Sequence, residues 1–427
     1  MQTLTVKLKQ HTPLIHFQHD QNGATLRASE VKPNLDKFIL TRLGGGKYQD
    51  GVEQAKTNRW LIGKGDHPAL DYKMRIEAPP GQIWDMSRNT GRVNKKGNPV
   101  FDTMPLFFGN MGNEEDSSIQ LKKMTFCSYP VSLIITTVNE TLLKYIRESL
   151  NTFFLYHNFG TRQSKGFGCF MPQGSPIVNY ITSDYAKFRF RLNNTEAESW
   201  NGFYNLFTGI DYFYKTLRSG INQNGVYIKS LMYSYALDMD EYWDKRTIRY
   251  EFEHFTYNKE TDKGELSDFK TDGENKKEIA RLYRDMLGLS SSQTWNSYAR
   301  DIITKEHKPV TPEDGIDRFK SPILFKPIFH NGAYDVYLIP SIIPNSYLGT
   351  TFDISSKNKG RHFTMETPKV FDVNDFLQFI TCQETYDLMS KRLNKIIEAA
   401  ERERRGKAKR IAQTLLSIYN SLSYVEK

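Results

Sequence analysis

The chain has 427 residues, of which 38% are hydrophobic and 25% are charged. This length suits two domains of roughly 150 to 200 residues each. A mean hydropathy of -0.59 argues against both a membrane protein and a disordered chain. Lysine and arginine outnumber aspartate and glutamate by 58 to 49, which favours a polyanionic partner such as a nucleic acid.

The three cysteines, Cys127, Cys169 and Cys382, lie far apart and form no CxxC pair. The sequence therefore predicts neither a disulfide framework nor a cysteine zinc site. The first residues, MQTLTVKLKQ, alternate like a strand and lack the apolar core of a signal peptide. The longest apolar run, 131–138, is far too short to span a membrane. We expect a cytoplasmic protein without a membrane partner, a cofactor or a metal.

The first 157 residues carry strand and helix signals in alternation. Residues 2–9 alternate with period two, as a half-buried strand does. A helix is predicted from Ser29, as N-cap, to Leu43, and another from Asn139, as N-cap, to His157. Further strands are predicted at 14–18, 71–77, 119–128 and 131–138.

Residues 44–105 are rich in glycine, asparagine, lysine and arginine. Loops longer than about 12–15 residues are uncommon and are often functional. Because Trp60 and Trp84 stand among the basic residues of this insert, we interpret it as a binding excursion. The alternative is a mobile flap.

Residues 158–170 read NFGTRQSKGFGCF. Glycines permit positive φ and close approach, so this backbone could turn its amides toward a phosphate. Arg162 and Lys165 add positive charge at the same place. The spacing fits neither a P-loop nor a Rossmann turn. The alternative is a tight glycine-rich connection with incidental surface charge.

This segment resembles the glycine-rich loop of the RAMP superfamily, in which a glycine and a few basic or polar residues precede G-F-G at the start of a strand. Residues 12–40 (TPLIHFQ…GATLRASEVKPNLDKFIL) are similar to the opening of Cmr-type subunits, and residues 318–328 (RFKSPILFKPI) to a strand of their second half. The chain thus resembles a subunit of a type III CRISPR effector complex. Its landmark order is most like that of the double-ferredoxin Cmr subunit at the crRNA 3′ end. One departure is the segment Glu30-Val31-Lys32-Pro33, which replaces the family's usual glycine and puts a carboxylate and a proline nearby.

The resemblance implies an α+β protein with two ferredoxin-like (RRM-like) domains and long insertions. The expected domains are 1–178, with the glycine-rich loop and the basic insert, and 179–427, with a basic C-terminal helix. It further implies a non-catalytic RNA-binding subunit that contacts crRNA or target RNA in antiviral defence, with other effector subunits as partners. The candidate RNA-binding residues are Arg27, Lys32, Lys37, Gly160, Arg162, Gln163, Lys165, Gly166, Phe167, Gly168, Arg318 and Lys320.

The second half yields further predictions from periodicity alone. We expect strands at 184–192, 225–235 and 247–257, and helices at 194–217 and 276–287. Residues 385–419 read as one long helix, with nine basic and three acidic residues between positions 391 and 410. This charged stretch is either a solvated face or a contact with RNA or a neighbouring subunit.

Catalysis is the main alternative function, because the RAMP superfamily also includes a crRNA-processing endoribonuclease. Such an enzyme would use a histidine as general acid or base, and His157, just before the glycine-rich loop, is the candidate. On a strand, His16 and His19 would point to opposite faces, which disfavours a shared metal site or an acid–base pair. No HExxH, GxSxG or kinase signature is present. A protein-interaction module with incidental basic charge is the third possibility.

Overall fold

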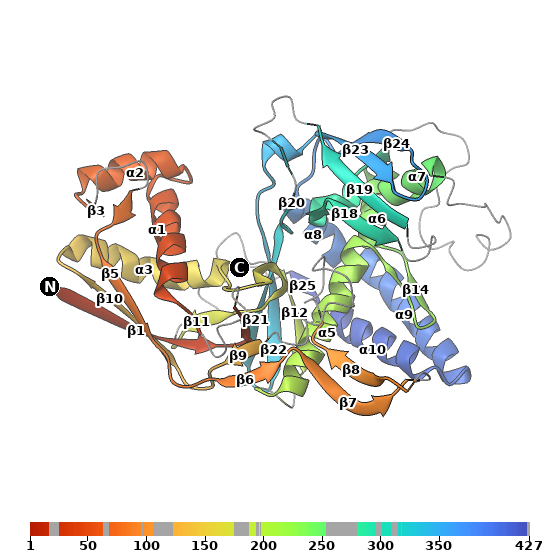
Figure 1. Ribbon diagram of the computed structural model, residues 1–427, viewed down its shortest axis with the longest axis horizontal. Helices are drawn as coiled ribbons and strands as arrows, with labels where there is room; N and C mark the ends of the chain where they lie inside the picture. Colours follow the sequence, from red (N-terminus) through yellow and green to blue (C-terminus); the bar gives the residue numbers. More distant parts are fainter. Residues whose placement is uncertain are drawn as a thin grey trace.

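The computed structural model describes residues 1–16, 25–62, 68–94, 97–105, 123–174, 188–193, 196, 198–252, 280–295, 301–308, 315–316 and 318–424. Two halves lie side by side, the first in red to yellow and the second in green to blue (Figure 1). The last main strand of the first half ends at Pro172 and the first of the second half begins at Phe188. The predicted boundary between 178 and 179 lies between them, outside the described residues.

The first domain contains a βαββαβ unit. Its sheet has the order β11-β1-β10-β5, and the neighbouring strands are antiparallel. Strand β10 is buried along most of its length, and Asn139 caps the second helix by accepting a hydrogen bond from the Leu142 amide at 3.0 Å. The unit is formed by β1 (Gln2–Gln10), α1 (Ala28–Leu43), β5 (Lys73–Glu77), β10 (Val131–Thr137), α3 (Glu140–Tyr156) and β11 (Phe170–Pro172).

The second domain repeats this arrangement, with the sheet order β21-β22-β12-β25. The repeat confirms the predicted α+β class with two ferredoxin-like domains. It is formed by β12 (Phe188–Asn193), α5 (Trp200–Arg218), β21 (Ile323–His330), β22 (Ala333–Pro340), α10 (Gly406–Ser421) and β25 (Ser423–Tyr424).

The basic insert of the first domain is folded over most of its described length. Helix α2 (Tyr48–Thr57) packs on α1, where Gly51 lies against the Leu40 carbonyl, and Val52 and Ala55 are buried. Only a few apolar residues carry this packing, so periodicity did not reveal the helix. The insert also contains β3 (Leu61–Ile62), β4 (Ala69–Leu70), β6 (Gln82–Asp85), β7 (Ser87–Val93) and β8 (Pro99–Thr103), with β3 and β4, and β7 and β8, paired as hairpins. Strand β6 joins β2 (Leu14–Ile15) and β9 (Lys123–Phe126), which lie outside the insert, in the sheet β2-β9-β6.

Longer insertions enlarge the second domain around a six-stranded sheet of order β15-β16-β24-β23-β19-β18. Its strands are β15 (Tyr242–Trp243), β16 (Ala280–Arg281), β18 (Ser292–Trp295), β19 (Asp301–His307), β23 (Thr351–Ser356) and β24 (His362–Glu366). The flanking elements are β13 (Ile221–Gln223), β14 (Val226–Ile228), α6 (Leu231–Asp238), α7 (Asp244–Glu251), β17 (Leu289–Ser290), β20 (Arg318–Phe319), α8 (Val373–Thr381), α9 (Gln383–Arg402) and the short 3-10 helices Tyr283–Leu287 and Asn345–Tyr347.

Several local predictions for the second half were wrong. Within 225–235, strand β14 ends at Ile228 and helix α6 follows, because the Ser230 hydroxyl accepts the Met232 amide at 3.1 Å as its N-cap. Residues 244–251 form helix α7 rather than a strand, and 280–287 form β16 and a 3-10 turn rather than a helix. The long C-terminal helix is a hairpin of α9 and α10, because Arg404 adopts a left-handed φ of 55°. At the start of the chain, α1 begins at Ala28, one residue before its predicted N-cap.

Two hydrophobic cores form the interior, and each draws residues from both domains. The core of the first domain includes Ile328 and Ile339 from β21 and β22. The core of the second domain includes Phe126 and Phe167 from the first domain. Because each core contains side chains of the other half, the two domains interlock.

Candidate nucleic-acid interface

The glycine-rich loop lies between α3 and β11, against strand β21 of the second domain. Its Phe167 is buried and stacks on Phe207 of α5, with ring centroids 3.7 Å apart. A Cβ on Gly166 would lie 2.8 Å from Pro327. We call this contact of residues 158–170 with β21 and α5 the interdomain joint.

The amides of the loop are engaged inside the protein. Gly160 donates to the Glu30 carboxylate at 2.7 Å, and Gly168 donates to the Pro13 carbonyl at 2.8 Å. The Thr161 amide donates to Ile15 at 2.8 Å, and that of Gly166 to Gln163 at 3.1 Å. These amides therefore do not form the phosphate cradle that the sequence suggested. The glycines serve close packing instead, because a Cβ on Gly168 would lie 1.9 Å from the Phe159 carbonyl oxygen.

Glu30 explains part of this outcome. Its carboxylate, from the first turn of α1, binds the Gly160 amide from within the same chain. Burial raises the pKa of Glu30, and the hydrogen bond from Gly160 opposes that rise. The Glu30 carboxylate thus satisfies the Gly160 amide from within the chain.

Lys165 is part of the joint and does not face solvent. Its side chain is buried, with Nζ 3.1 Å from the centroid of the Tyr214 ring. Burial lowers the pKa of Lys165 well below its usual value, and Arg218 and Arg162 act in the same direction. In this structure the Lys165 side chain is therefore not exposed for contact with RNA. Gly160, Gly166, Phe167 and Gly168 are likewise buried, so RNA contact by these members of the predicted set has no support in this structure.

Lys326 and Asn158 hold the joint together, and the sequence prediction missed both. The fully buried Lys326 ammonium donates to the carbonyls of His157 at 2.9 Å and Phe170 at 3.2 Å, and to the Asn158 side chain at 3.0 Å. The Asn158 amide group donates to the carbonyls of Gln163 at 2.8 Å and Phe325 at 2.9 Å. The available signal was a lysine inside the apolar run ILFKPIF, where burial demands hydrogen-bond partners.

Four residues of the predicted set form a basic edge on this joint. Arg162 and Gln163 lie at the half-buried tip of the loop, while Arg318 and Lys320 are exposed where the second domain meets it. Burial lowers the pKa of Arg162, and the neighbouring Arg318 guanidinium lowers it further. We call Arg162, Gln163, Arg318 and Lys320 the joint rim. The rim brings Arg162 of the first domain together with Arg318 and Lys320 of the second, which follow about 150 residues later in the sequence.

The remaining candidates lie on or beside α1. Lys37 is exposed and Arg27 is half-buried. The Lys32 ammonium bonds to Asp36 at 2.8 Å and lies 3.9 Å from the centroid of the Tyr72 ring. Lys32 thus supports the packing of α1, whereas RNA contact by Arg27 and Lys37 stays a prediction.

His157 is placed in a packing role. Its Nδ1 lies 2.8 Å from the Phe153 carbonyl, and its ring packs on Phe153 with centroids 4.5 Å apart. Burial lowers the pKa of His157 to about 4, with Lys326 and Lys320 acting in the same direction. A general base for RNA cleavage works best with a pKa near the operating pH, so this environment is unfavourable for that role.

His11 also lies at the joint and predicts a pH-dependent stability. Its Nδ1 accepts the Phe329 amide of the second domain at 3.0 Å, and burial, with smaller effects of Lys9 and Lys326, lowers its pKa to about 3. Because an unfolded histidine titrates near 6.5, the stabilisation is complete above that pH and is lost as the pH falls toward 3. Protonation of His11 in the unfolded chain should lower the free energy of unfolding by about 2 kcal/mol at pH 5 relative to neutral pH.

Urea unfolding of the protein at several pH values measures this effect. His11→Asn keeps a hydrogen-bond acceptor near the position of Nδ1, but its side chain does not titrate. Between pH 7 and pH 5, the unfolding free energy of this variant should therefore fall by about 2 kcal/mol less than that of the unchanged protein. An identical pH dependence of the two proteins would show that His11 does not link pH to folding.

The basic residues of α9 and α10 divide into two groups. Arg392 donates twice to the Tyr227 carbonyl, at 2.7 and 3.1 Å, and Arg405 donates to that of Gly225 at 3.0 Å, so both fix the β13–β14 hairpin. Lys409 pairs with Glu401 at 2.8 Å. Exposed side chains along the hairpin are Lys391, Lys395, Arg402, Arg404, Lys407 and Arg410.

Metal ligands and membrane-spanning helices in the described residues are two further features that would bear on function. No group of three His, Cys, Asp or Glu side chains there is arranged to hold a metal ion. Of the helices in those same residues, none is both long and apolar enough to cross a membrane.

Profiles of two family domains match the chain in order. The Cmr1 N-terminal domain matches residues 1–221 and the Cmr1 C-terminal domain matches residues 227–403. The chain belongs to the Cmr1 family. Cmr1 proteins are RAMP subunits of type III-B CRISPR effector complexes, so the predicted superfamily and type of complex are confirmed.

One solved Cmr1 structure and the curated proteins were also compared with the chain. The apo crystal structure of Cmr1 from Pyrococcus furiosus is 10% identical, with a TM-score of 0.33, over 86% of this chain and 99% of that one. None of the curated proteins matches. The Cmr1 assignment therefore rests on the two domain profiles.

Proposed function

We propose that this Cmr1-family chain is an RNA-binding, non-catalytic subunit of its effector ribonucleoprotein and that it contacts crRNA or target RNA through the joint rim. The observation that carries the proposal is the convergence of Arg162 with Arg318 and Lys320 at one edge of the two domains. Like charges held close together repel one another, and a polyanion relieves that repulsion. The net charge of +9 acts in the same direction over longer distances.

The non-catalytic part of the proposal is supported by the state of His157. Its pKa of about 4 and its Nδ1 contact with the Phe153 carbonyl favour a neutral ring in a fixed orientation. The alternative of a metal-independent endoribonuclease requires a histidine that exchanges protons with RNA near neutral pH.

Salt-dependent RNA binding tests the rim. Each phosphate contact to single-stranded RNA contributes about 0.7 to the slope of log Kd against log salt concentration. Replacing both Arg318 and Lys320 by alanine should therefore lower that slope by about 1.4 and weaken binding at low salt. Fluorescence anisotropy with a labelled single-stranded RNA at several salt concentrations measures both quantities.

The matched control removes two exposed lysines outside the rim, Lys357 and Lys359, in the turn after β23. If both double variants change the slope equally, the charge effect is unspecific and the rim is not the site. The same incubations report on catalysis. RNA cleavage that is abolished by His157→Ala would replace the proposed subunit role with the endoribonuclease.

A further inference from the structure

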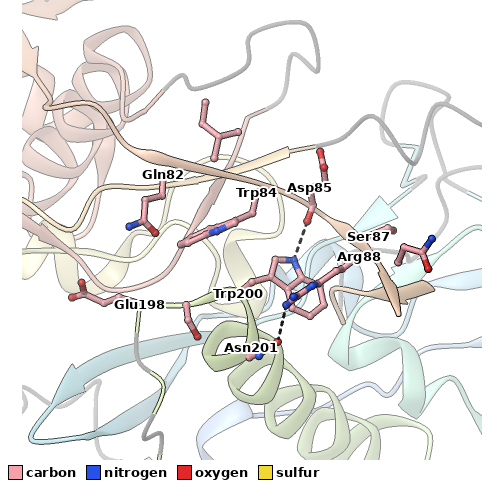
Figure 2. Close-up of a pocket in the computed structure, with 11 residues that line it drawn as sticks. Gln82, Trp84, Asp85, Ser87, Arg88, Glu198, Trp200 and Asn201 are labelled. Carbon is pink, nitrogen blue, oxygen red and sulfur yellow. Dashed lines mark hydrogen bonds between the residues drawn. The ribbon is translucent and has the colours of Figure 1, made fainter. Parts of the chain in front are cut away.

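A cleft of about 630 Å³ opens where the basic insert of the first domain meets the N-terminus of α5. One wall is the end of β6 and the beginning of β7, and the other is the turn that leads into α5. Figure 2 shows Trp84, Asp85 and Arg88 on the first wall and Glu198, Trp200 and Asn201 on the second. The cleft thus lies between the two domains, as the joint does.

Two indole rings are held at fixed positions in this cleft. Trp84 is half-exposed and is supported from behind by Phe126 and Phe203, at centroid distances of 6.3 and 5.8 Å. Trp200 stacks on Tyr204 at 5.2 Å with an interplanar angle of 15°. Rings that are already immobile lose little entropy when another flat group stacks on them.

Hydrogen bonds across the cleft fix the distance between its walls. The Trp200 indole N–H donates to the Asp85 carbonyl at 2.9 Å, and the Arg88 guanidinium donates to the Asn201 side chain at 3.4 Å. Both bonds are drawn as dashed lines in Figure 2. The cleft is therefore formed before any ligand binds.

The charges in the cleft do not favour a phosphate inside it. One carboxylate, Glu198, and one guanidinium, Arg88, belong to its lining, while the Asp85 carboxylate points away, so the cleft has no net positive charge (Figure 2). Glu198 is held at a φ of 61°, a left-handed conformation that is uncommon for residues other than glycine. An uncharged flat group with amino donors fits this lining, whereas an anion does not.

We propose that this cleft, the base slot, receives one unstacked base of the RNA that the chain binds, and that it prefers bases with an exocyclic amino group. The inference rests on the proposed RNA-binding function. Trp84 supplies the stacking face, and the Glu198 carboxylate accepts a hydrogen bond from the amino group, as acidic side chains do from cytosine N4. The Asp85 carboxylate points away from the Trp84 ring, because the two residues are adjacent in β6 (Figure 2). Arg92, exposed on β7 and outside the lining of the slot, faces the sugar-phosphate chain.

Cytidine and uridine oligonucleotides provide the sharpest comparison, because the bases differ in the amino or keto group at C4. The full-length protein should bind the cytidine oligonucleotide more tightly. Trp84→Ala should weaken that binding between about fivefold and about 150-fold, the usual range for loss of one base–aromatic stack. Its salt slope should stay unchanged, because no phosphate contact is removed.

Variants at the acids and elsewhere separate the slot from general effects. Glu198→Gln should reduce the cytidine preference without lowering affinity for uridine, whereas Asp85→Asn should leave the preference unchanged. Trp84→Phe keeps a stacking ring and should retain most of the affinity, whereas Trp84→Ala should not. Tyr129→Ala, which removes an aromatic residue that is 72% exposed outside the slot, should leave both affinities unchanged.

The outcomes distinguish the two proposals. If the protein binds RNA with a normal salt slope but Trp84→Ala changes neither affinity nor base preference, the base slot is overturned and the RNA-binding function stands. If the protein binds neither oligonucleotide, both proposals fall. Circular dichroism and thermal unfolding of each variant show whether a loss of binding reflects a loss of folding.

Discussion

Replacing Lys326 by methionine is expected to lower the free energy of unfolding by about 3–5 kcal/mol. Methionine nearly preserves the volume of the side chain, so little cavity is created. The substitution removes the three hydrogen bonds that the Lys326 ammonium donates to the His157 carbonyl, the Phe170 carbonyl and the Asn158 side-chain oxygen. Each buried polar group left unpaired costs about 1–3 kcal/mol. Urea unfolding at neutral pH, followed by circular dichroism, measures the change.

Lys320→Met is the matched control, because Lys320 is exposed only six residues away. Surface substitutions of this kind usually change stability by less than about 0.5 kcal/mol. If Lys326→Met also falls within that range, the three acceptors must find other partners, and the joint does not depend on the lysine.

The fold was well predicted because its main elements carry local signals. Strand β1 alternates along its length, and Asn139 stands before a regular apolar stripe, so both elements were identified from their own residues. The double ferredoxin-like order came from the resemblance of three separated segments. The turn at Arg404 was missed because no proline or long polar loop separates α9 from α10, although Gly406, a weak helix former, stands at the start of α10.

The mechanism of the glycine-rich loop could not be derived from its own sequence. Glycines next to basic residues indicate an exposed anion site only if nothing packs over them. Here Pro327 and Phe207, which are far away in sequence, cover Gly166 and Phe167. The sequence therefore located an important segment correctly but assigned its amides the wrong partners.

The two tryptophans of the basic insert show the same limit. Trp60 and Trp84 stand in similar polar surroundings in the sequence. Trp60 is buried against Tyr145 of α3, and its indole N–H donates to Thr141 at 3.0 Å, so it belongs to the core. Trp84 faces the cleft beside α5. Contacts with residues more than 80 positions away decide between the two roles.

The largest backbone effect is expected at Gly168. Alanine there must keep a φ of 66° and bring a Cβ within 1.9 Å of the Phe159 carbonyl oxygen. Left-handed strain of about 1–2 kcal/mol and overpacking of about 1–3 kcal/mol predict a loss of about 2–5 kcal/mol in unfolding free energy. Gly174 has a similar φ of 72° with nothing within 4 Å of its added Cβ.

Comparing Gly168→Ala with Gly174→Ala by urea unfolding isolates the packing contribution, because both variants carry the left-handed strain. Gly168→Ala should be the less stable by about 1–3 kcal/mol. Equal losses would mean that the loop moves freely away from Phe159. The Gly168 amide is already bonded to the Pro13 carbonyl, so it is not available to a phosphate. If the difference in stability is found, weaker RNA binding by a glycine variant of this loop would mean that Arg162 and the joint have moved. Only variants of exposed rim side chains then test phosphate contact directly.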